Sequence, residues 1–235
     1  MKTTAKSILP FIYFATALIE ITGELMRTTD TTPWLVYISK PLLMPMLMIW
    51  FLFHENALSS VIRKCVFISL IFSMGGDIFL MFHADHLFVF GLSSFLLAHV
   101  LYIVGFWHQA SGSLPWGGRF VLSLPYILFI LGFLYILKGH ILRNDATAPL
   151  FIPVVVYASV IGIMGMAASW RVSSTNRRSF YFILFGALLF ILSDSMIAIN
   201  KFVSPIPYVA VWVMSTYVTA QFLIVKGTLI HSKIK

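Results

Sequence analysis

Two aspartates stand out in this sequence because each lies in a stretch that is otherwise apolar enough to sit in a lipid bilayer. Asp77 lies in Ser73–Phe82 (SMGGDIFLMF), and Asp194 lies in Gly186–Phe202 (GALLFILSDSMIAINKF). An ionised carboxylate in hydrocarbon is costly, so such a residue is usually partnered, neutral or in contact with water. A pair of these acids can act as general acid and general base, one holding a proton that the other lacks. The structural alternative is a carboxyl group hydrogen-bonded to a neighbouring helix, with the glycines before Asp77 allowing close approach.

Other polar residues occur in similarly apolar sequence. Lys40 lies in Ser39–Pro45 (SKPLLMP) and is expected to be the counter-ion of an acid or a ligand for a phosphate; otherwise its side chain extends to the membrane surface. Ser193 and Ser195 flank Asp194 and are expected either to tune its carboxyl group or to hydrogen-bond it. Neither serine lies in a G-x-S-x-G motif, which argues against a serine nucleophile.

Charged residues also lie near the predicted helix ends. Lys201 follows Asp194 by seven residues and therefore shares its helix face, where it either anchors the helix or binds a lipid headgroup. Glu20 and Glu24 form an i,i+4 pair that either belongs to a pocket or is solvated at the end of its helix.

Two further pairs each share one helix face: His99 with Tyr102, and Tyr217 with Gln221. They either orient substrate or water, or make hydrogen bonds between helices. Each pair follows one of the two aspartates at a similar separation, which is the pattern that a duplicated helical hairpin would leave, although chance would also produce it. The complete set of candidate substrate-binding residues is Lys40, Glu24, His99, Tyr102, Ser193, Asn200, Lys201, Tyr217 and Gln221.

The composition is that of a membrane protein. Hydrophobic residues make up 60% of the 235 residues and charged residues only 10%, against about 25% charged residues in soluble domains. The net charge of +8 would suggest nucleic-acid binding in a soluble protein, but here it indicates topology and contact with anionic headgroups. A single cysteine, Cys65, excludes an intrachain disulfide and a cysteine-cluster metal site.

Apolar segments near the length of about 20 residues that a span requires recur along the chain. They predict an all-α, polytopic protein: one integral-membrane domain, residues 1–235, formed by a bundle of eight transmembrane helices. The first segment is too long for the apolar region of a cleaved signal peptide. The expected spans are Ser7–Met26, Pro33–Phe53, Arg63–Phe82, His86–Trp107, Phe120–Leu137, Pro149–Trp170, Phe180–Asn200 and Pro207–Ile230.

The distribution of lysine and arginine predicts that the N- and C-termini are cytoplasmic, because basic residues are enriched on that side. On the side of the termini lie Lys2, Lys6, Arg63, Lys64, Arg119, Arg171, Arg177, Arg178, Lys226, Lys233 and Lys235, whereas Arg27, Lys138, Arg143 and Lys201 lie on the other.

The predicted topology also places the charged side chains at one depth. Asp77 and Asp194 belong to helices that run in the same direction, and each lies about four residues past the middle of its span, or about 6 Å beyond the midplane. Lys40, on a helix of opposite direction, falls at a similar depth. Groups that share one layer can line a single cavity.

No metal or organic cofactor is expected. His83, Asp85 and His86 cluster in a loop, but neither a fourth ligand nor an H-E-x-x-H helix accompanies them. Phosphate-binding, dinucleotide-binding and haem-attachment motifs are absent from the sequence.

The sequence resembles the YhhN family of eight-span membrane proteins, whose animal members are lysoplasmalogenases. The resemblance lies in Ser39–Leu47 (SKPLLMPML), Gly75–Phe82 (GGDIFLMF), Phe90–Tyr102 (FGLSSFLLAHVLY), Gly186–Phe202 and Ser215–Leu223 (STYVTAQFL). It implies hydrolysis of the vinyl-ether bond of lysoplasmalogens to a fatty aldehyde and glycerophosphoethanolamine or glycerophosphocholine. The partners would then be a lysophospholipid substrate and membrane lipids, without nucleic acid, in a bacterial inner membrane; no oligomeric state is predicted.

The two aspartates suit this reaction. Protonation of the outer alkene carbon of a vinyl ether gives an oxocarbenium ion, which glycosidases also form between two carboxyl groups. The main alternative is a proton-coupled transporter or exporter of a lipid or other amphipathic molecule, because paired acids and proline-broken helices also occur in transporters. A ligand-binding receptor is a third interpretation, supported only by the multi-span form.

Overall fold

A computed structural model describes residues 2–27, 33–54, 59–82, 85–110 and 114–231 of this chain. Within these ranges the structure is all-α, with eight helices that are long and apolar enough to cross a membrane. The predicted polytopic helical fold is therefore confirmed. The long helices are α1 (Lys2–Leu25), α2 (Trp34–Phe53), α3 (Ser60–Met81), α4 (Asp85–Gln109), α5 (Trp116–Ile141), α6 (Phe151–Ser169), α7 (Arg177–Phe202) and α8 (Val209–Leu229). The 3-10 turns η1 (Ala148–Leu150) and η2 (Trp170–Ser173) extend α6 at its two ends.

The helix boundaries differ from the predicted spans by a few residues, most clearly in α5. This helix begins at Trp116 rather than Phe120, with Pro115 in extended conformation as its N-cap. It continues to Ile141 because Lys138 and His140 end the apolar run without breaking the helix. Hydropathy identifies the part of a helix that suits lipid, not the point at which the helix ends.

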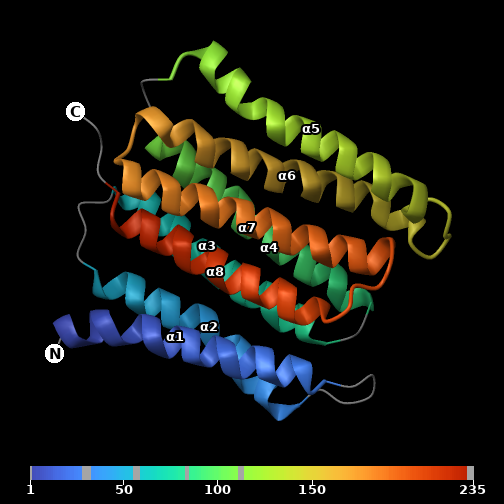
Figure 1. The fold of residues 1–235 in the computed structure, drawn as a ribbon, viewed down its shortest axis with the longest axis horizontal. Helices are drawn as coiled ribbons and strands as arrows, with labels where there is room; N and C mark the ends of the chain where they lie inside the picture. The colour runs from blue at the N-terminus through green and yellow to red at the C-terminus, as the bar shows by residue number, and fades with distance from the viewer. Residues whose placement is uncertain (1, 28–32, 55–58, 83–84, 111–113, 232–235) are drawn as a thin grey trace.

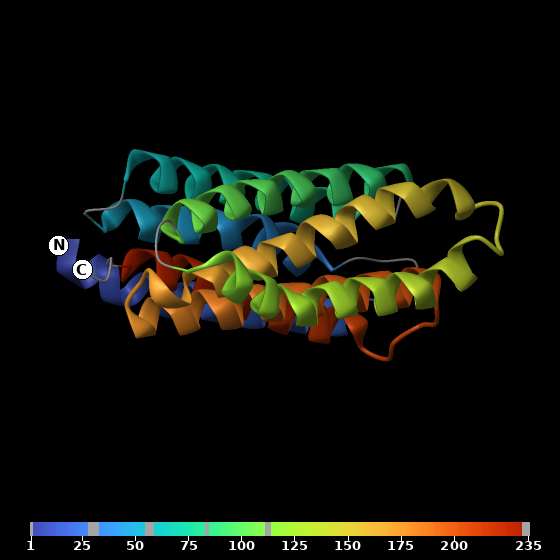
Figure 2. The same ribbon diagram turned by 90° about the horizontal axis from the view of Figure 1, so that it is seen from above.

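The helices form a closed ring. Around the ring, each helix packs against the next in the order α1, α2, α3, α4, α6, α7, α8 and back to α1. Helix α5 lies outside the ring against α6, at the edge of the bundle opposite α1 and α2 (Figure 1). The chain ends marked N and C lie at the same end of the bundle (Figure 2). Lys233 and Lys235, which contribute to the predicted orientation, lie outside the described residues.

Glycines set the close packing within two helical hairpins of this ring. In α3, a Cβ atom on Gly76 would lie 2.5 Å from the Phe95 ring of α4, so this position admits no side chain without movement. In α7, a Cβ atom on Gly186 would lie 3.0 Å from the Ala220 carbonyl oxygen of α8. The aspartates follow on these same helices, so the glycine contacts help to position them.

Aromatic side chains fill the space between the two hairpins. Phe95 of α4, Phe190 of α7 and Tyr217 of α8 meet edge to face, with ring centroids 5.4 to 6.2 Å apart. All three side chains are buried. The polar groups of the centre therefore lie next to a rigid apolar core rather than in a wide aqueous channel.

Candidate active site

The two aspartates line the same cavity. Asp77 of α3 and Asp194 of α7 contribute to a cavity of about 40 Å³, whose other polar lining residues are Lys40, Ser193 and Tyr217. We call this cavity the carboxyl chamber. Asp77 is 3% exposed, and the Asp194 side chain is 10% exposed. The shared cavity expected from the depth of these residues is therefore present.

Each aspartate is hydrogen-bonded to a tyrosine from another helix. The Tyr217 hydroxyl of α8 donates to Asp77 Oδ2 at 2.8 Å, and the Tyr157 hydroxyl of α6 donates to Asp194 Oδ2. His99 Nε2 of α4 lies 3.8 Å from the same oxygen of Asp194. Each carboxyl group thus accepts a hydrogen bond from a phenol of another helix.

The pairing crosses between the two hairpins. Tyr217 follows Asp194 in the sequence but contacts Asp77, whereas His99 follows Asp77 but lies beside Asp194. The two ring nitrogens of His99 have no hydrogen-bond partner among the described residues. A crossed arrangement of this kind fits two related hairpins packed face to face, and their duplication stays a prediction.

The two serines beside Asp194 donate their hydrogen bonds to backbone carbonyls, so the hydrogen bonds expected between them and Asp194 are not formed. Ser193 donates to the Val213 carbonyl of α8 at 3.2 Å, and Ser195 donates to the Ile191 carbonyl one turn earlier in its own helix at 2.6 Å. Both serines are adjacent to Asp194 in the sequence. Adjacent residues of a helix point to different faces, so these hydroxyls cannot easily reach the carboxyl group.

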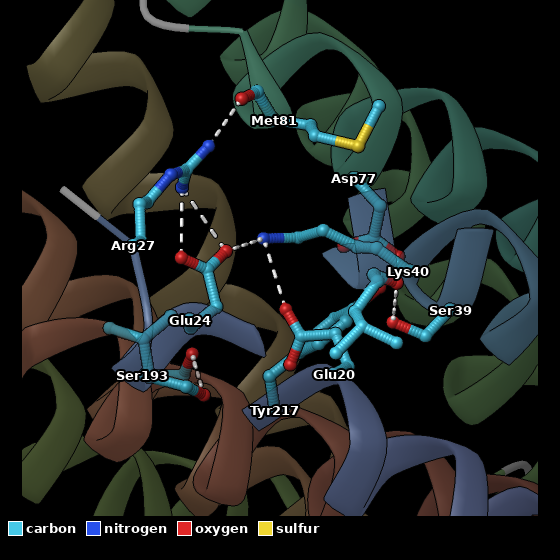
Figure 3. A network of polar contacts seen from close by, with 11 residues as sticks. Glu20, Glu24, Arg27, Ser39, Lys40, Asp77, Met81, Ser193 and Tyr217 are labelled. Carbon is cyan, nitrogen blue, oxygen red and sulfur yellow. Dashed lines mark hydrogen bonds and ion pairs between the residues drawn. The ribbon is translucent and has the colours of Figure 1, made fainter. Parts of the chain in front are cut away.

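Lys40 belongs to a cluster of charges at the edge of the carboxyl chamber. Its Nζ atom lies 3.2 Å from Glu24 Oε1 and 3.5 Å from Glu20 Oε1, both on α1. Arg27 makes two hydrogen bonds to Glu24, at 2.9 and 3.1 Å, and one to the Met81 carbonyl at 2.7 Å. Figure 3 shows the Glu24 carboxylate between the two cations. The acids nearest to Lys40 are therefore these glutamates rather than the aspartates.

A larger polar cavity adjoins the chamber. It has a volume of about 290 Å³, and its polar lining residues are Glu24, Arg27, Lys40, Asn200 and Lys201. We call it the polar vestibule. Lys40 and Met214 line both cavities, so the two are neighbours. Asn200 accepts a hydrogen bond from the Ile206 N–H at 2.9 Å, and Lys201 Nζ lies 5.1 Å from the centre of the Phe88 ring.

Tyr102 and Gln221 lie elsewhere. The Tyr102 hydroxyl donates to Gln221 Oε1 at 2.6 Å, and the Gln221 amide donates to Ser73 Oγ at 2.9 Å. All three residues are fully buried, and they join α3, α4 and α8. This arrangement matches the interhelical hydrogen bonds that the sequence allowed as the alternative.

Tyr157 and Arg27 are members of the site that sequence reasoning missed. Tyr157 lies on α6, for which no polar candidate was proposed from the sequence. The position of Tyr157 along its span, at a depth similar to that of Asp194, was the signal that could have identified it. Arg27 entered only as a basic residue near a helix end. Its spacing of three residues after Glu24 was the signal that could have identified the pair.

No group of three or more histidine, cysteine, aspartate or glutamate side chains within the described ranges could hold a metal ion. Of the loop cluster considered above, His83 and the Asp85 side chain lie outside what the structure describes.

The fold and the site define a multi-pass integral-membrane protein with two carboxyl groups in one intramembrane cavity. The chain belongs to the YhhN family, whose sequence model matches residues 35–228. It is 34% identical over 168 residues to lysoplasmalogenase TMEM86A from Bos taurus and from Homo sapiens, which covers 68% of this chain and 62% of each relative.

A bacterial relative is also similar. The chain is 31% identical over 140 residues to a lysoplasmalogenase from Mycobacterium bovis, covering 60% of this chain and 50% of that protein. The chain thus matches between half and two thirds of the length of these curated relatives. No solved structure matches it.

Proposed function

We propose that this protein hydrolyses the vinyl-ether bond of lysoplasmalogens, releasing a fatty aldehyde and glycerophosphoethanolamine or glycerophosphocholine. The relatives named lysoplasmalogenase support the substrate class. The observation that carries the proposal is that Asp77 and Asp194 line one small cavity inside the bundle. Two carboxyl groups in one such cavity suit a reaction that needs a proton donor and a group that stabilises a cation.

The proposed reaction adds one water across the bond. One aspartic acid donates its proton to the outer alkene carbon, which leaves a cation shared by the inner carbon and the ether oxygen. The other aspartate, ionised, stabilises this cation and accepts a proton from the water that attacks the inner carbon. The hemiacetal then collapses to the aldehyde: its hydroxyl proton goes to the carboxylate that donated first, and the other aspartic acid protonates the ether oxygen, which leaves as the alcohol of the glycerophospho compound. Both carboxyl groups are thereby restored. Asp77 and Asp194 are thus proposed as the catalytic residues.

The polar vestibule is the proposed site of the phosphate group. Lys40, Arg27 and Lys201 bring three positive charges to this region, and Glu20 and Glu24 bring two negative charges when ionised. The three cations are the groups that could pair with the negative charge of a phosphodiester. In a cavity of low dielectric constant a cation attracts an anion more strongly than it would in water.

The chemistry requires no metal or organic cofactor, because the two carboxyl groups supply and accept the protons. The proposed location is a bacterial inner membrane. A one-tailed lipid in that membrane would reach the site without leaving the bilayer.

The test uses purified protein in detergent, where no membrane barrier allows transport. Wild-type protein is expected to release aldehyde from lysoplasmenylethanolamine, and Asp77→Asn and Asp194→Asn are each expected to abolish release. Asp145→Asn, in an exposed loop position, is the matched control and should retain activity. Near-normal turnover by either of the first two variants would contradict the two-carboxyl mechanism, and tight binding without product would indicate a carrier.

Deuterium labelling tests the step itself. In D₂O, protonation of the outer alkene carbon should place one deuterium on the carbon next to the aldehyde group. The aldehyde is trapped by reduction as it forms, and its mass is then measured. An unlabelled product would exclude carbon protonation by a group in exchange with solvent.

A further inference from the structure

A third cavity adjoins the carboxyl chamber and is almost entirely apolar. It has a volume of about 50 Å³ and lies among α3, α4, α5, α6 and α7. Its lining includes Phe129, Val154, Ala158 and Ala198, and polar groups occur only at Asp194, Tyr157 and Ser195. We call it the apolar pocket. Neither the proposed mechanism nor the proposed phosphate site uses it.

The three cavities are arranged in series. Asp194 lines both the carboxyl chamber and the apolar pocket, and Lys40 lines both the chamber and the polar vestibule. Leu80 and Ile197 line all three. The order is therefore a charged vestibule, then two carboxyl groups, then an apolar pocket.

This series runs inward from the end of the bundle opposite the termini. Lys201, in the vestibule, is the penultimate residue of α7. Asp194 comes seven residues earlier, which places it about 10 Å deeper along the helix at about 1.5 Å per residue. Phe129, which lines the apolar pocket, lies in the middle of α5. The apolar pocket thus reaches the middle of the span.

An apolar groove on the outside of the bundle adjoins the apolar pocket at Phe129. Phe129 also lines an apolar groove of about 630 Å³ between α5 and α7, together with Val121, Leu184 and Leu188. Phe129 is 36% exposed and stacks on Phe133, so one ring forms the boundary between pocket and groove. The groove follows the earlier half of α5 and of α7, away from the vestibule.

A lysolipid has the same order of parts: a charged headgroup, a glycerol, the vinyl ether and a long apolar chain. We infer that the apolar pocket and the groove beyond Phe129 bind the alkenyl chain of the substrate, while its headgroup occupies the polar vestibule. The inference rests on the proposed function. It means that the lipid binds in the orientation it already has in the leaflet at the end opposite both termini. Contacts between the apolar chain and the apolar groove also favour binding, and no charged group has to lose its hydration to make them.

The pocket cannot hold the whole chain. The pocket has about a third of the roughly 150 Å³ of an engineered apolar cavity that holds one benzene molecule. The pocket therefore accommodates only the first carbons after the vinyl ether, and the rest of a long chain passes Phe129 into the groove. Chain length is then recognised outside the catalytic cavity, which gives the experiment its contrast.

The test fills the groove and varies the chain. Leu188→Trp adds a larger side chain to the groove wall, beyond the pocket that holds the first carbons. We expect it to lower kcat/KM for a lysoplasmalogen with a C18 alkenyl chain at least tenfold, mainly through KM. Turnover of an analogue whose alkenyl chain has only four carbons, and therefore ends in the pocket, should stay within about twofold of wild type. Leu18→Trp, at an exposed position of α1, is the control and should change neither.

Equal losses for both chain lengths in folded Leu188→Trp, or no loss for the C18 chain, would overturn the inference and leave the proposed function standing. Photo-crosslinking of wild-type protein provides a second measurement that does not depend on this variant or on turnover. A lysolipid with an uncleavable ether and a diazirine at the chain end should label peptides of α5 and α7 that contain Val121, Leu184 or Leu188. A diazirine on the headgroup should label the end of α7 and the start of α8. Exchanged labelling, or chain-end labelling confined to α1 and α2, would also overturn the inference.

Discussion

At the scale of single residues, the tyrosines that donate to the aspartates are the most informative targets. Tyr217→Phe and Tyr157→Phe each remove one hydrogen bond to a carboxyl group of the chamber. A hydrogen bond to a charged group contributes about 1.5–3 kcal/mol, so we expect kcat to fall roughly 10- to 100-fold if that energy is used in the transition state. Steady-state aldehyde release measures this.

A buried tyrosine outside the cavities provides the matched control for those variants. The Tyr13 hydroxyl donates to the Val218 carbonyl at 2.9 Å, so Tyr13→Phe loses a hydrogen bond that is buried like that of Tyr217 but involves neither aspartate. Equal effects of all three substitutions on kcat would show that the phenol–carboxyl bonds have no special role in catalysis.

Lys40 supports a prediction about stability. Lys40→Met leaves Glu20 without its cation and Glu24 with Arg27 alone, all in a largely buried setting. Breaking a buried ion pair by removing one partner costs about 3–5 kcal/mol, so we expect a clear loss of unfolding free energy in detergent. Adding Glu20→Gln should recover part of this loss, because it removes the unpaired charge. A double variant no more stable than Lys40→Met would argue that Glu20 carries no charge in the folded protein.

At the scale of helices, the packing of α7 on α8 is predicted to control both stability and activity. A methyl group on Gly186 would lie 3.0 Å from a carbonyl oxygen and 3.1 Å from a backbone nitrogen of α8, and backbone atoms cannot rotate away. Overpacking costs about 1–3 kcal/mol, so Gly186→Ala should lower the melting temperature. It should also reduce turnover, since separating α7 from α8 moves Asp194 relative to Tyr217 and its partner Asp77.

Gly132 in α5 is the control for this prediction. A Cβ atom there would meet nothing within 4 Å, so Gly132→Ala is expected to leave packing unchanged and to favour the helix slightly. A melting temperature lowered equally by both substitutions would contradict the argument from backbone contact.

At the scale of the whole molecule, the orientation in the membrane can be tested directly. Both ends of the chain lie at one end of the bundle, and the excess of basic residues predicts that this end is cytoplasmic. In a Cys65→Ser background, a membrane-impermeant maleimide should label Asp145→Cys in intact cells. Gly117→Cys, at the opposite end, should react only after permeabilisation. The reverse result would invert the topology and assign the polar vestibule to the cytoplasmic side.

The ring arrangement explains how so small a bundle can contain a polar site. The hairpins α3–α4 and α7–α8 face each other across the ring, and helices α1, α2 and α6 close it on both sides. Each wall supplies a group that the aspartates or Lys40 need: the glutamates come from α1, Lys40 from α2 and Tyr157 from α6. Few of these groups are near one another in sequence, so the site exists only when the ring is closed.

The sequence by itself determined the number, order and approximate length of the helices, and also the common depth of Asp77, Asp194 and Lys40. These properties are local: apolar length is additive along a segment, and every residue of a helix adds the same rise. The tertiary structure decided which groups meet, including the crossed pairing of Tyr217 with Asp77, the glutamate partners of Lys40 and the position of Tyr157. In a helix that is apolar on every side, the hydrophobic pattern does not distinguish the face toward lipid from the face toward its neighbours. Rotation about each helix axis, and therefore every contact across the ring, depends on packing between segments far apart in the chain.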